Sequence, residues 1–198
     1  MMPSISRLPM RIVSVFALGA AFSWTGAGCT DRGTKPKEEP AAKPAAPAPA
    51  KGKVARAAIE GRSSSKLSGE AVFTEVEGGV KVEVHVASAP PGKHAVHIHE
   101  KGDCSAPDAS SAGTHFNPDS HPHGAPTAAQ HHAGDFGNME VAADGAGKLE
   151  LVAKSLTVKE GTHSVVGRSI IIHEKEDDFS QPVGNAGGRI GCGVIKAE

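Results

Sequence analysis

The sequence predicts an all-β domain, an eight-stranded Greek-key sandwich or barrel, and three observations support this prediction. Residues 80–86, VKVEVHV, alternate strictly between apolar and polar side chains, which is the period of a half-buried strand. Turn signals such as APPG at 89–92 and ADGAG at 143–147 separate short apolar runs. No stretch carries a helical period, and because aromatic residues make up only 4% of the chain, Val, Ile, Leu and Ala must build the core.

The first predicted strand covers residues 54–60, and residues 69–86 form a hairpin that turns at an EGG sequence. Alternation in the second arm places Val80, Val82, Val84 and Val86 toward the core, with Lys81, Glu83 and His85 outside. Further strands between turn signals are expected at 94–99, 139–143, 148–153, 165–173 and 189–196. Short strands of this number and spacing fit a Greek-key sandwich or barrel.

Residues 1–28 have the features of a secretory signal sequence. Arg7 and Arg11 precede the apolar run IVSVFALGAAF, which is too short for a membrane-spanning helix of about 20 residues. The segment ends in TGAGC, which resembles the lipobox of bacterial lipoproteins, so we expect Cys29 to become the lipidated N-terminus; the alternative is an ordinary signal peptidase site. The protein is therefore expected on the periplasmic side of the cell envelope. Thr30, in place of the aspartate that retains lipoproteins in the inner membrane, favours the outer membrane.

Residues 30–53 are rich in Pro, Ala and Lys and lack apolar periodicity, so we expect an extended tether before a domain at 54–198. The tether carries six Lys/Arg and three Asp/Glu, a charge of +3, whereas residues 54–198 carry 13 Lys/Arg and 19 Asp/Glu, a charge of −6. A basic stalk on an acidic domain suits an anionic membrane surface, with the lipid as the only membrane contact. The negative charge of the domain argues against nucleic-acid binding. We expect a monomer or a homodimer.

Eleven histidines in 198 residues point to metal binding. His97 and His99 are two residues apart in a predicted strand, so their imidazoles share one face and form either a solvated polar face or half of a metal site. Five more histidines lie between residues 102 and 138, a stretch with few apolar residues that is expected to be a loop ordered by something it binds. The seven candidate ligands are His97, His99, His115, His123, His132, Asp135 and His173. Imidazole suits copper and zinc, and seven ligands fill two sites if one imidazolate is shared.

Six segments, HIHEKGDC, SAGTHFNP, HGAP, HHAGDFGN, IIIHEKEDD and GNAGGRIGCGVI, occur in the order of the copper/zinc superoxide dismutase motifs, so that residues 54–197 resemble this family. The short DDFSQPVGNAGGR connection and the long segment between Cys104 and His115 resemble its bacterial secreted branch. The resemblance implies a Greek-key barrel with long metal-binding and electrostatic loops. It also implies that Cys104 pairs with Cys192, which would add on the order of 4 kcal/mol of stability and leave Cys29 as the odd cysteine.

The resemblance also implies the metal ligands. It assigns copper to His97, His99, His115 and His173, and zinc to His115, His123, His132 and Asp135, so that His115 bridges the two metals. Asp177 matches a carboxylate that connects one copper ligand to one zinc ligand. Arg189 matches the arginine at the mouth of the copper channel.

Several histidines compete for these roles. His132 is preferred over His131 because only His132 has the H-x-G-D spacing to Asp135, and His123 is preferred over His121 because it precedes Gly-x-Pro. His94 matches a family histidine that holds a loop without binding metal. Solvent-facing imidazoles are expected at His85, His121, His131 and His163.

The implied function is disproportionation of superoxide to oxygen and hydrogen peroxide by copper that cycles between Cu(II) and Cu(I), with structural zinc. His115 would supply a proton, and Arg189 would attract the anion to a domain whose net charge repels it, with Lys101 and Lys175 as further candidates. The alternative is a metal-sequestering module on the same scaffold. Such a module needs the histidines but neither Arg189 nor a shared ligand.

Overall fold

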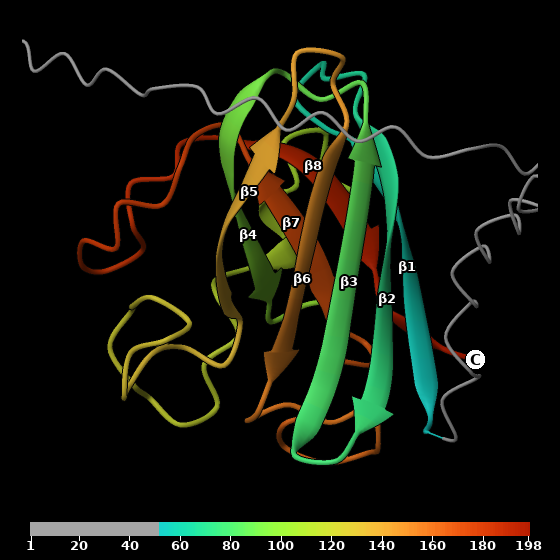
Figure 1. The fold of residues 1–198 in the computed structure, drawn as a ribbon, viewed down its shortest axis with the longest axis vertical. Helices are drawn as coiled ribbons and strands as arrows, with labels where there is room; N and C mark the ends of the chain where they lie inside the picture. Colours follow the sequence, from blue (N-terminus) through green and yellow to red (C-terminus); the bar gives the residue numbers. More distant parts are fainter. Residues whose placement is uncertain (1–51) are drawn as a thin grey trace, which may run out of the picture. The chain divides into compact units, whose positions relative to one another are not determined.

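Eight antiparallel strands close into a barrel (Figure 1). The order of the strands around the barrel confirms the predicted Greek key. The computed structural model describes residues 52–198; the predicted signal sequence, Cys29 and residues 30–51 of the predicted tether lie outside this range. The strands are β1 (Val54–Gly61), β2 (Ser68–Val76), β3 (Gly79–Ala87), β4 (Gly92–His99), β5 (Asp135–Val141), β6 (Gly147–Ala153), β7 (Ser169–His173) and β8 (Arg189–Val194). Around the barrel they follow the order β1-β2-β3-β6-β5-β4-β7-β8, and β8 pairs back with β1. A short ninth strand, β9 (Lys196–Ala197), pairs antiparallel with the start of β1.

The barrel interior follows the alternation expected from the sequence. Val80, Val82 and Val84 of β3 are fully buried, whereas His85 is exposed. β4 is an exception because its last six residues are all buried. Val96 and Ile98 join the core, and the opposite face of the strand is covered by loops and carries His97 and His99.

Two strands begin four residues away from the predicted position. β5 begins at Asp135 instead of residue 139, because the Asp135 carboxylate is buried and its backbone pairs with His97 of β4. β7 begins at Ser169 instead of residue 165. A turn precedes it, in which Gly167 has a φ of 78°, outside the range of a strand.

The predicted strand 189–196 is divided in the structure. β8 ends at Val194, and the N–H of Ile195 donates to the carbonyl oxygen of Arg168, away from the barrel ladder. The chain then resumes as β9 beside β1.

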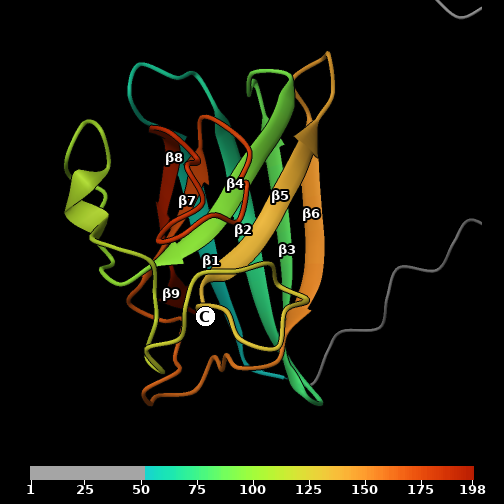
Figure 2. The same cartoon turned by 90° about the vertical axis from the view of Figure 1, so that its left-hand side faces the viewer.

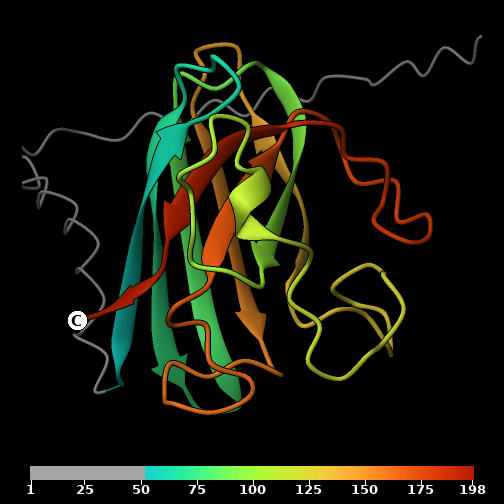
Figure 3. The ribbon, with the colours of Figure 1, turned by 180° about the vertical axis from the view of Figure 1, so that it is seen from behind.

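The segment between β4 and β5 contains one helix, a 3-10 turn at Ser110–Ala112, and lies over β7 and β8 when the barrel is seen from behind (Figure 3). A disulfide between Cys104 and Cys192, with a Cα–Cα distance of 5.9 Å, joins this segment to β8 and confirms the predicted pair. Later residues of the same segment and the connection between β7 and β8 project from one side of the barrel (Figure 1), the side that faces the viewer in Figure 2. No helix within residues 52–198 has the length and apolar character needed to cross a bilayer.

Candidate metal centre

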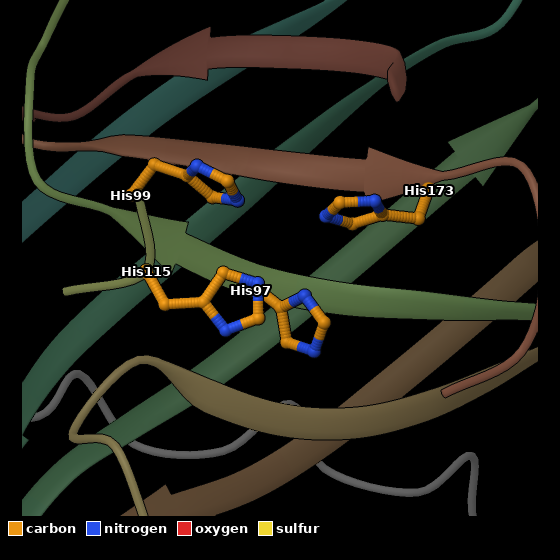
Figure 4. Close-up of side chains that lie close together, drawn as sticks. All are labelled: His97, His99, His115 and His173. Atoms are coloured by element: carbon orange, nitrogen blue, oxygen red, sulfur yellow. The ribbon is translucent and has the colours of Figure 1, made fainter. Parts of the chain in front are cut away.

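Four histidines gather where β4 and β7 end beside the long loop (Figure 4). His97 and His99 lie on β4, His173 is the last residue of β7, and a backbone bridge between His99 and His115 brings the loop to the same place. The ring centroids of His97 and His173 are 4.9 Å apart, and those of His97 and His115 are 4.1 Å apart. In this set each side chain offers one nitrogen within 4.8 Å of the others.

A second cluster shares His115 with the first. It consists of His115, His123, His132 and Asp135, all buried, with ligand atoms again within 4.8 Å of one another. Asp135 is held by backbone N–H groups, because Gly124 and His132 donate to its Oδ2 at 3.1 and 2.9 Å. The structure thus brings together all seven candidate ligands in two sets that meet at one imidazole.

Hydrogen bonds leave one nitrogen directed inward on three of the four first-cluster imidazoles. Nε2 of His97 donates to Asp177 Oδ2 at 2.9 Å, and Nδ1 of His99 donates to the Gly113 carbonyl oxygen at 2.9 Å. Nδ1 of His173 faces the carbonyl oxygen of Gly187 at 3.4 Å. The remaining atoms, His97 Nδ1, His99 Nε2 and His173 Nε2, are buried and have no hydrogen-bond partner within residues 52–198. Buried unpaired nitrogens that converge on one point fit a metal ion.

The second cluster fits a cation for a similar reason. His123 donates Nε2–H to Asp177 Oδ1 at 2.9 Å, which leaves Nδ1 as a bare lone pair. That Nδ1 lies 3.0 Å from Asp135 Oδ2 without forming a hydrogen bond. Two acceptor atoms at this distance repel unless a cation lies between them, and three imidazoles with one carboxylate are the donor set of tetrahedral zinc.

Asp177 connects the two clusters. Its two carboxylate oxygens accept hydrogen bonds from His97 in the first cluster and His123 in the second. The side chain is buried, and its backbone N–H is bonded to Asn138 Oδ1 at 2.7 Å. Asp177 therefore fixes the ring orientation of one residue in each cluster at the same time.

Burial keeps His97, His99 and His173 neutral, which is the form that binds metal. Burial lowers the pKa of His97 to about 4, although its hydrogen bond to Asp177 acts in the opposite direction. Burial likewise lowers the pKa of His99 to about 2 and that of His173 to about 3.

Asp135 remains ionised. Burial raises the pKa of this carboxyl, but the hydrogen bond from His115 and the nearby His123 and His132 outweigh burial and lower the pKa to about 2. The second cluster therefore presents a full negative charge to a cation.

Arg189 lies in the wall of a cavity of about 500 Å³ that reaches the first cluster. The cavity is lined by His99, Thr114, His115, His173, Val183, Asn185, Ala186, Gly187 and Arg189. The guanidinium donates to the carbonyl oxygens of Ala109 at 2.6 Å and Gly113 at 2.7 Å. Burial lowers the pKa of Arg189, yet arginine remains charged at neutral pH, so the guanidinium places positive charge beside His99 and His173. Lys101 and Lys175 are exposed and do not line this cavity.

The remaining histidines lie outside both clusters. His94 is buried, and its two ring nitrogens face the carbonyl oxygens of His173 and Pro90 at 2.8 Å, so it joins a loop to the end of β7. His85 is exposed, as predicted, whereas His121 and His131 are half-buried. The side chain of His163 remains 38% exposed, in line with the prediction, and its Nε2 lies 3.0 Å from Asp119, a contact that the sequence did not indicate.

Comparisons with known proteins agree with this geometry. A sequence profile of the copper/zinc superoxide dismutase family matches residues 67–195. An extracellular superoxide dismutase [Cu-Zn] of Caenorhabditis elegans is 41% identical over 142 residues, which cover 68% of this chain and 63% of the relative. The matched region thus spans less than two thirds of that relative.

Two solved structures are also similar. The clock protein EA4 has a TM-score of 0.67 and 35% identity, over 74% of this chain and 96% of that one. A double mutant of a SOD-like protein from Bacillus subtilis has a TM-score of 0.65 and 36% identity, over 71% of this chain and 96% of that one. With a family match over more than half of its length and the two clusters described above, this chain belongs to the copper/zinc superoxide dismutase family.

Proposed function

We propose that this protein is a superoxide dismutase, which converts two superoxide anions and two protons into oxygen and hydrogen peroxide. The observation that carries the proposal is the pair of clusters joined at His115, with the first cluster open to a cavity that Arg189 lines. Copper and zinc are the cofactors of the family, and the unpaired nitrogens of the two clusters fit them. A matched relative that bears the dismutase name supports the same activity.

The assignment of residues to metals is part of the proposal. Copper is assigned to the first cluster, His97, His99, His115 and His173. Zinc is assigned to the second, His115, His123, His132 and Asp135. The carboxylate favours this division, because it adds a hard, charged ligand to the site whose ion has no redox chemistry.

When bound, copper supplies one-electron exchange between Cu(II) and Cu(I), and zinc supplies a fixed charge. The residues of the chain account for the rest. Arg189 attracts and orients the anion inside the cavity, where its charge is partly buried and therefore weakly screened. His115 is assigned to carry a proton on the ring nitrogen that faces the first cluster and to deliver it to the product. Asp177 keeps His97 and His123 in position during both half-reactions.

The experiment is a metal analysis combined with a superoxide-consumption assay on the purified protein. The proposal expects one copper and one zinc per chain, rapid loss of superoxide, and abolition of activity when copper is removed. A protein that binds both metals without consuming superoxide would be a metal store, and the proposed activity would be wrong.

We also propose an organisation for the whole chain: a signal sequence at residues 1–28, lipidation at Cys29, a tether at 30–53 and the dismutase domain at 54–198. The sequence features near the N-terminus support export, and the relative with an extracellular name is consistent with it. In this organisation the lipid holds the protein at the periplasmic side of the outer membrane, as a monomer or homodimer. Mass spectrometry of the mature N-terminus tests it, because an unmodified chain that begins at Met1 would contradict export.

A further inference from the structure

Gln181 contacts a residue of the second cluster through that residue's backbone. Nε2 of Gln181 donates to the carbonyl oxygen of His123 at 2.7 Å, and the N–H of His123 donates to Gln181 Oε1 at 3.2 Å. The side-chain amide thus pairs with His123 as an adjacent strand would, and it satisfies both backbone groups of one proposed zinc ligand. Gln181 is one of only two glutamines in the chain.

The loop that carries Gln181, residues 178–187, also holds the ring of His123. The ring of Phe179 stacks on His123 at a centroid distance of 6.5 Å and an interplanar angle of 24°. The N–H of Phe179 donates to Asp177 Oδ1 at 2.8 Å, the same oxygen that accepts from His123. Phe179 has a φ of 59°, a conformation that bulky residues rarely adopt, so these contacts hold a strained backbone in place.

Gly184 brings the same loop directly against the carboxylate–imidazole contact. A Cβ at this position would lie 1.8 Å from Asp177 Oδ1 and 2.7 Å from His123 Nε2, and the φ of Gly184 is +75°. Its neighbours Val183, Asn185, Ala186 and Gly187 line the cavity beside Arg189. One short loop therefore contacts His123 along one part and forms the cavity wall along another.

We propose that Gln181 is a positioning residue for His123, and that its amide is the contact that joins the backbone of this proposed zinc ligand to the loop 178–187, which also forms the cavity wall. This inference rests on the zinc site proposed above. Backbone hydrogen bonds fix where the His123 main chain lies, while Asp177 fixes how the ring is turned. A ligand held in both ways loses less freedom when the metal binds, so zinc remains bound longer.

The test compares Gln181→Met with Gln130→Met. Methionine has nearly the length of glutamine but forms neither hydrogen bond. Gln130 is exposed in the loop that carries His123, and its side chain forms no hydrogen bond within the part of the chain that the structure describes. Both variants and the parent are loaded with copper and zinc, and zinc transfer to a chromogenic chelator is timed. Hydrogen–deuterium exchange of residues 178–187 is then measured with and without zinc.

We expect Gln181→Met to release zinc about tenfold faster than the parent, within the range observed when supporting residues of a metal site are changed. Gln130→Met should release zinc at the parent rate. Zinc should slow exchange across residues 178–187 in the parent and in Gln130→Met, and this protection should be weaker in Gln181→Met. A second variant, Gln181→Glu, places a carboxylate oxygen against the His123 carbonyl oxygen, so it should release zinc at least as fast as Gln181→Met.

Two outcomes would overturn the inference. Equal zinc release from Gln181→Met and Gln130→Met, with a parent that holds zinc, would refute the role of Gln181 and leave the proposed function intact. A parent that retains no zinc after loading would refute the inference together with the proposed zinc site.

Discussion

Arg189 and His99 donate hydrogen bonds to the same carbonyl oxygen, that of Gly113, at 2.7 and 2.9 Å. The arginine that lines the cavity therefore also fixes the backbone group that orients a proposed copper ligand. Because the Gly113 carbonyl lies between Cys104 and His115 in the loop tied down by the disulfide, the loop, the ligand and the cationic side chain form one connected unit.

Replacement of Arg189 tests substrate attraction. Arg189→Ile should retain copper and zinc, since Arg189 lies outside both clusters, but should lower the rate about tenfold or more, within the range that electrostatic steering supplies. Arg189→Glu should lower it further because repulsion is added. Stopped-flow measurement of superoxide loss at several salt concentrations checks this. Added salt should slow the parent more than Arg189→Ile.

Arg189→Lys separates charge from geometry in the same assay. Lysine keeps the positive charge but cannot donate to Ala109 and Gly113 in the same way. We expect an intermediate rate with a normal salt dependence. Full activity in both Arg189→Ile and Arg189→Glu would remove the proposed role of this residue.

Removal of the carboxylate from the second cluster should release zinc while copper remains. Asp135→Asn replaces an ionised ligand by a neutral amide, so zinc content should fall well below one per chain and the loop before β5 should become more susceptible to proteases. Asp119→Asn is the control, because Asp119 is an exposed carboxylate of the same loop that pairs with His163. Elemental analysis would contradict the assignment if the two variants held the same amount of zinc.

Asp177→Asn should weaken both metal sites without removing a ligand. An asparagine offers one acceptor and one donor group, so either His97 or His123 would face an N–H where it now donates to oxygen. Metal affinity should fall about 10-fold to 100-fold. Competition with a chelator measures the metal affinity. The control is Asp178→Asn, which changes a neighbouring exposed carboxylate and should keep a metal affinity near that of the parent.

Glu75 lies outside both metal-binding clusters and makes the stability of the fold depend on pH. Burial raises the pKa of this carboxyl, but hydrogen bonds from the Val158 N–H at 2.7 Å and from Thr157 outweigh burial and hold the pKa below its ordinary value of 4.5. Because the pKa of Glu75 is lower in the folded than in the unfolded protein, its ionised form stabilises the fold fully at a pH above the unfolded-state pKa. This stabilisation is lost as the pH falls through the folded-state pKa. Glu75→Gln should therefore lower the free energy of unfolding by about 1 kcal/mol at pH 7, and the difference from the parent should shrink below pH 4.5.

Denaturant unfolding of the metal-free parent and Glu75→Gln at a series of pH values measures this effect. Glu77→Gln, in the exposed turn between β2 and β3, is the control and should match the parent throughout. A difference for Glu75→Gln that stays constant with pH would show that the carboxylate charge is not its cause.

Much of the fold followed from local sequence pattern. The alternation of Val80, Val82 and Val84 with polar residues predicted β3 correctly because only one face of that strand is buried. The same argument placed His97 and His99 on one face of β4, but the pattern alone left open whether that face met water or metal. The ligand sets came from the family resemblance, since they join residues up to 76 positions apart that only the closed barrel brings together.

The contacts that the loops make with the site could not be predicted from the sequence. The amide of Gln181 meets the backbone of His123 from a loop in which Phe179 and Gly184 adopt positive φ values. The contact of Arg189 with the Gly113 carbonyl likewise depends on how the loop beyond Cys104 turns. Backbone carbonyls are common to every residue, so nothing in the residue types marked these acceptors.

The closure of the barrel has a consequence for self-association. Each of the eight barrel strands in residues 52–198 has a paired neighbour on both sides, so none of them is an edge strand along its whole length. The ring is joined by only two residue pairs at two places, between β1 and β8 and between β5 and β6, and one of the β1–β8 pairs contains Cys192. Reduction of the Cys104–Cys192 bond would release the segment anchored beside β1 and β8, and separation of the two β1–β8 pairs would convert the closed ring into an open sheet with two free edges. The oxidised bond therefore reinforces one of the two seams at which the barrel has the fewest backbone pairs.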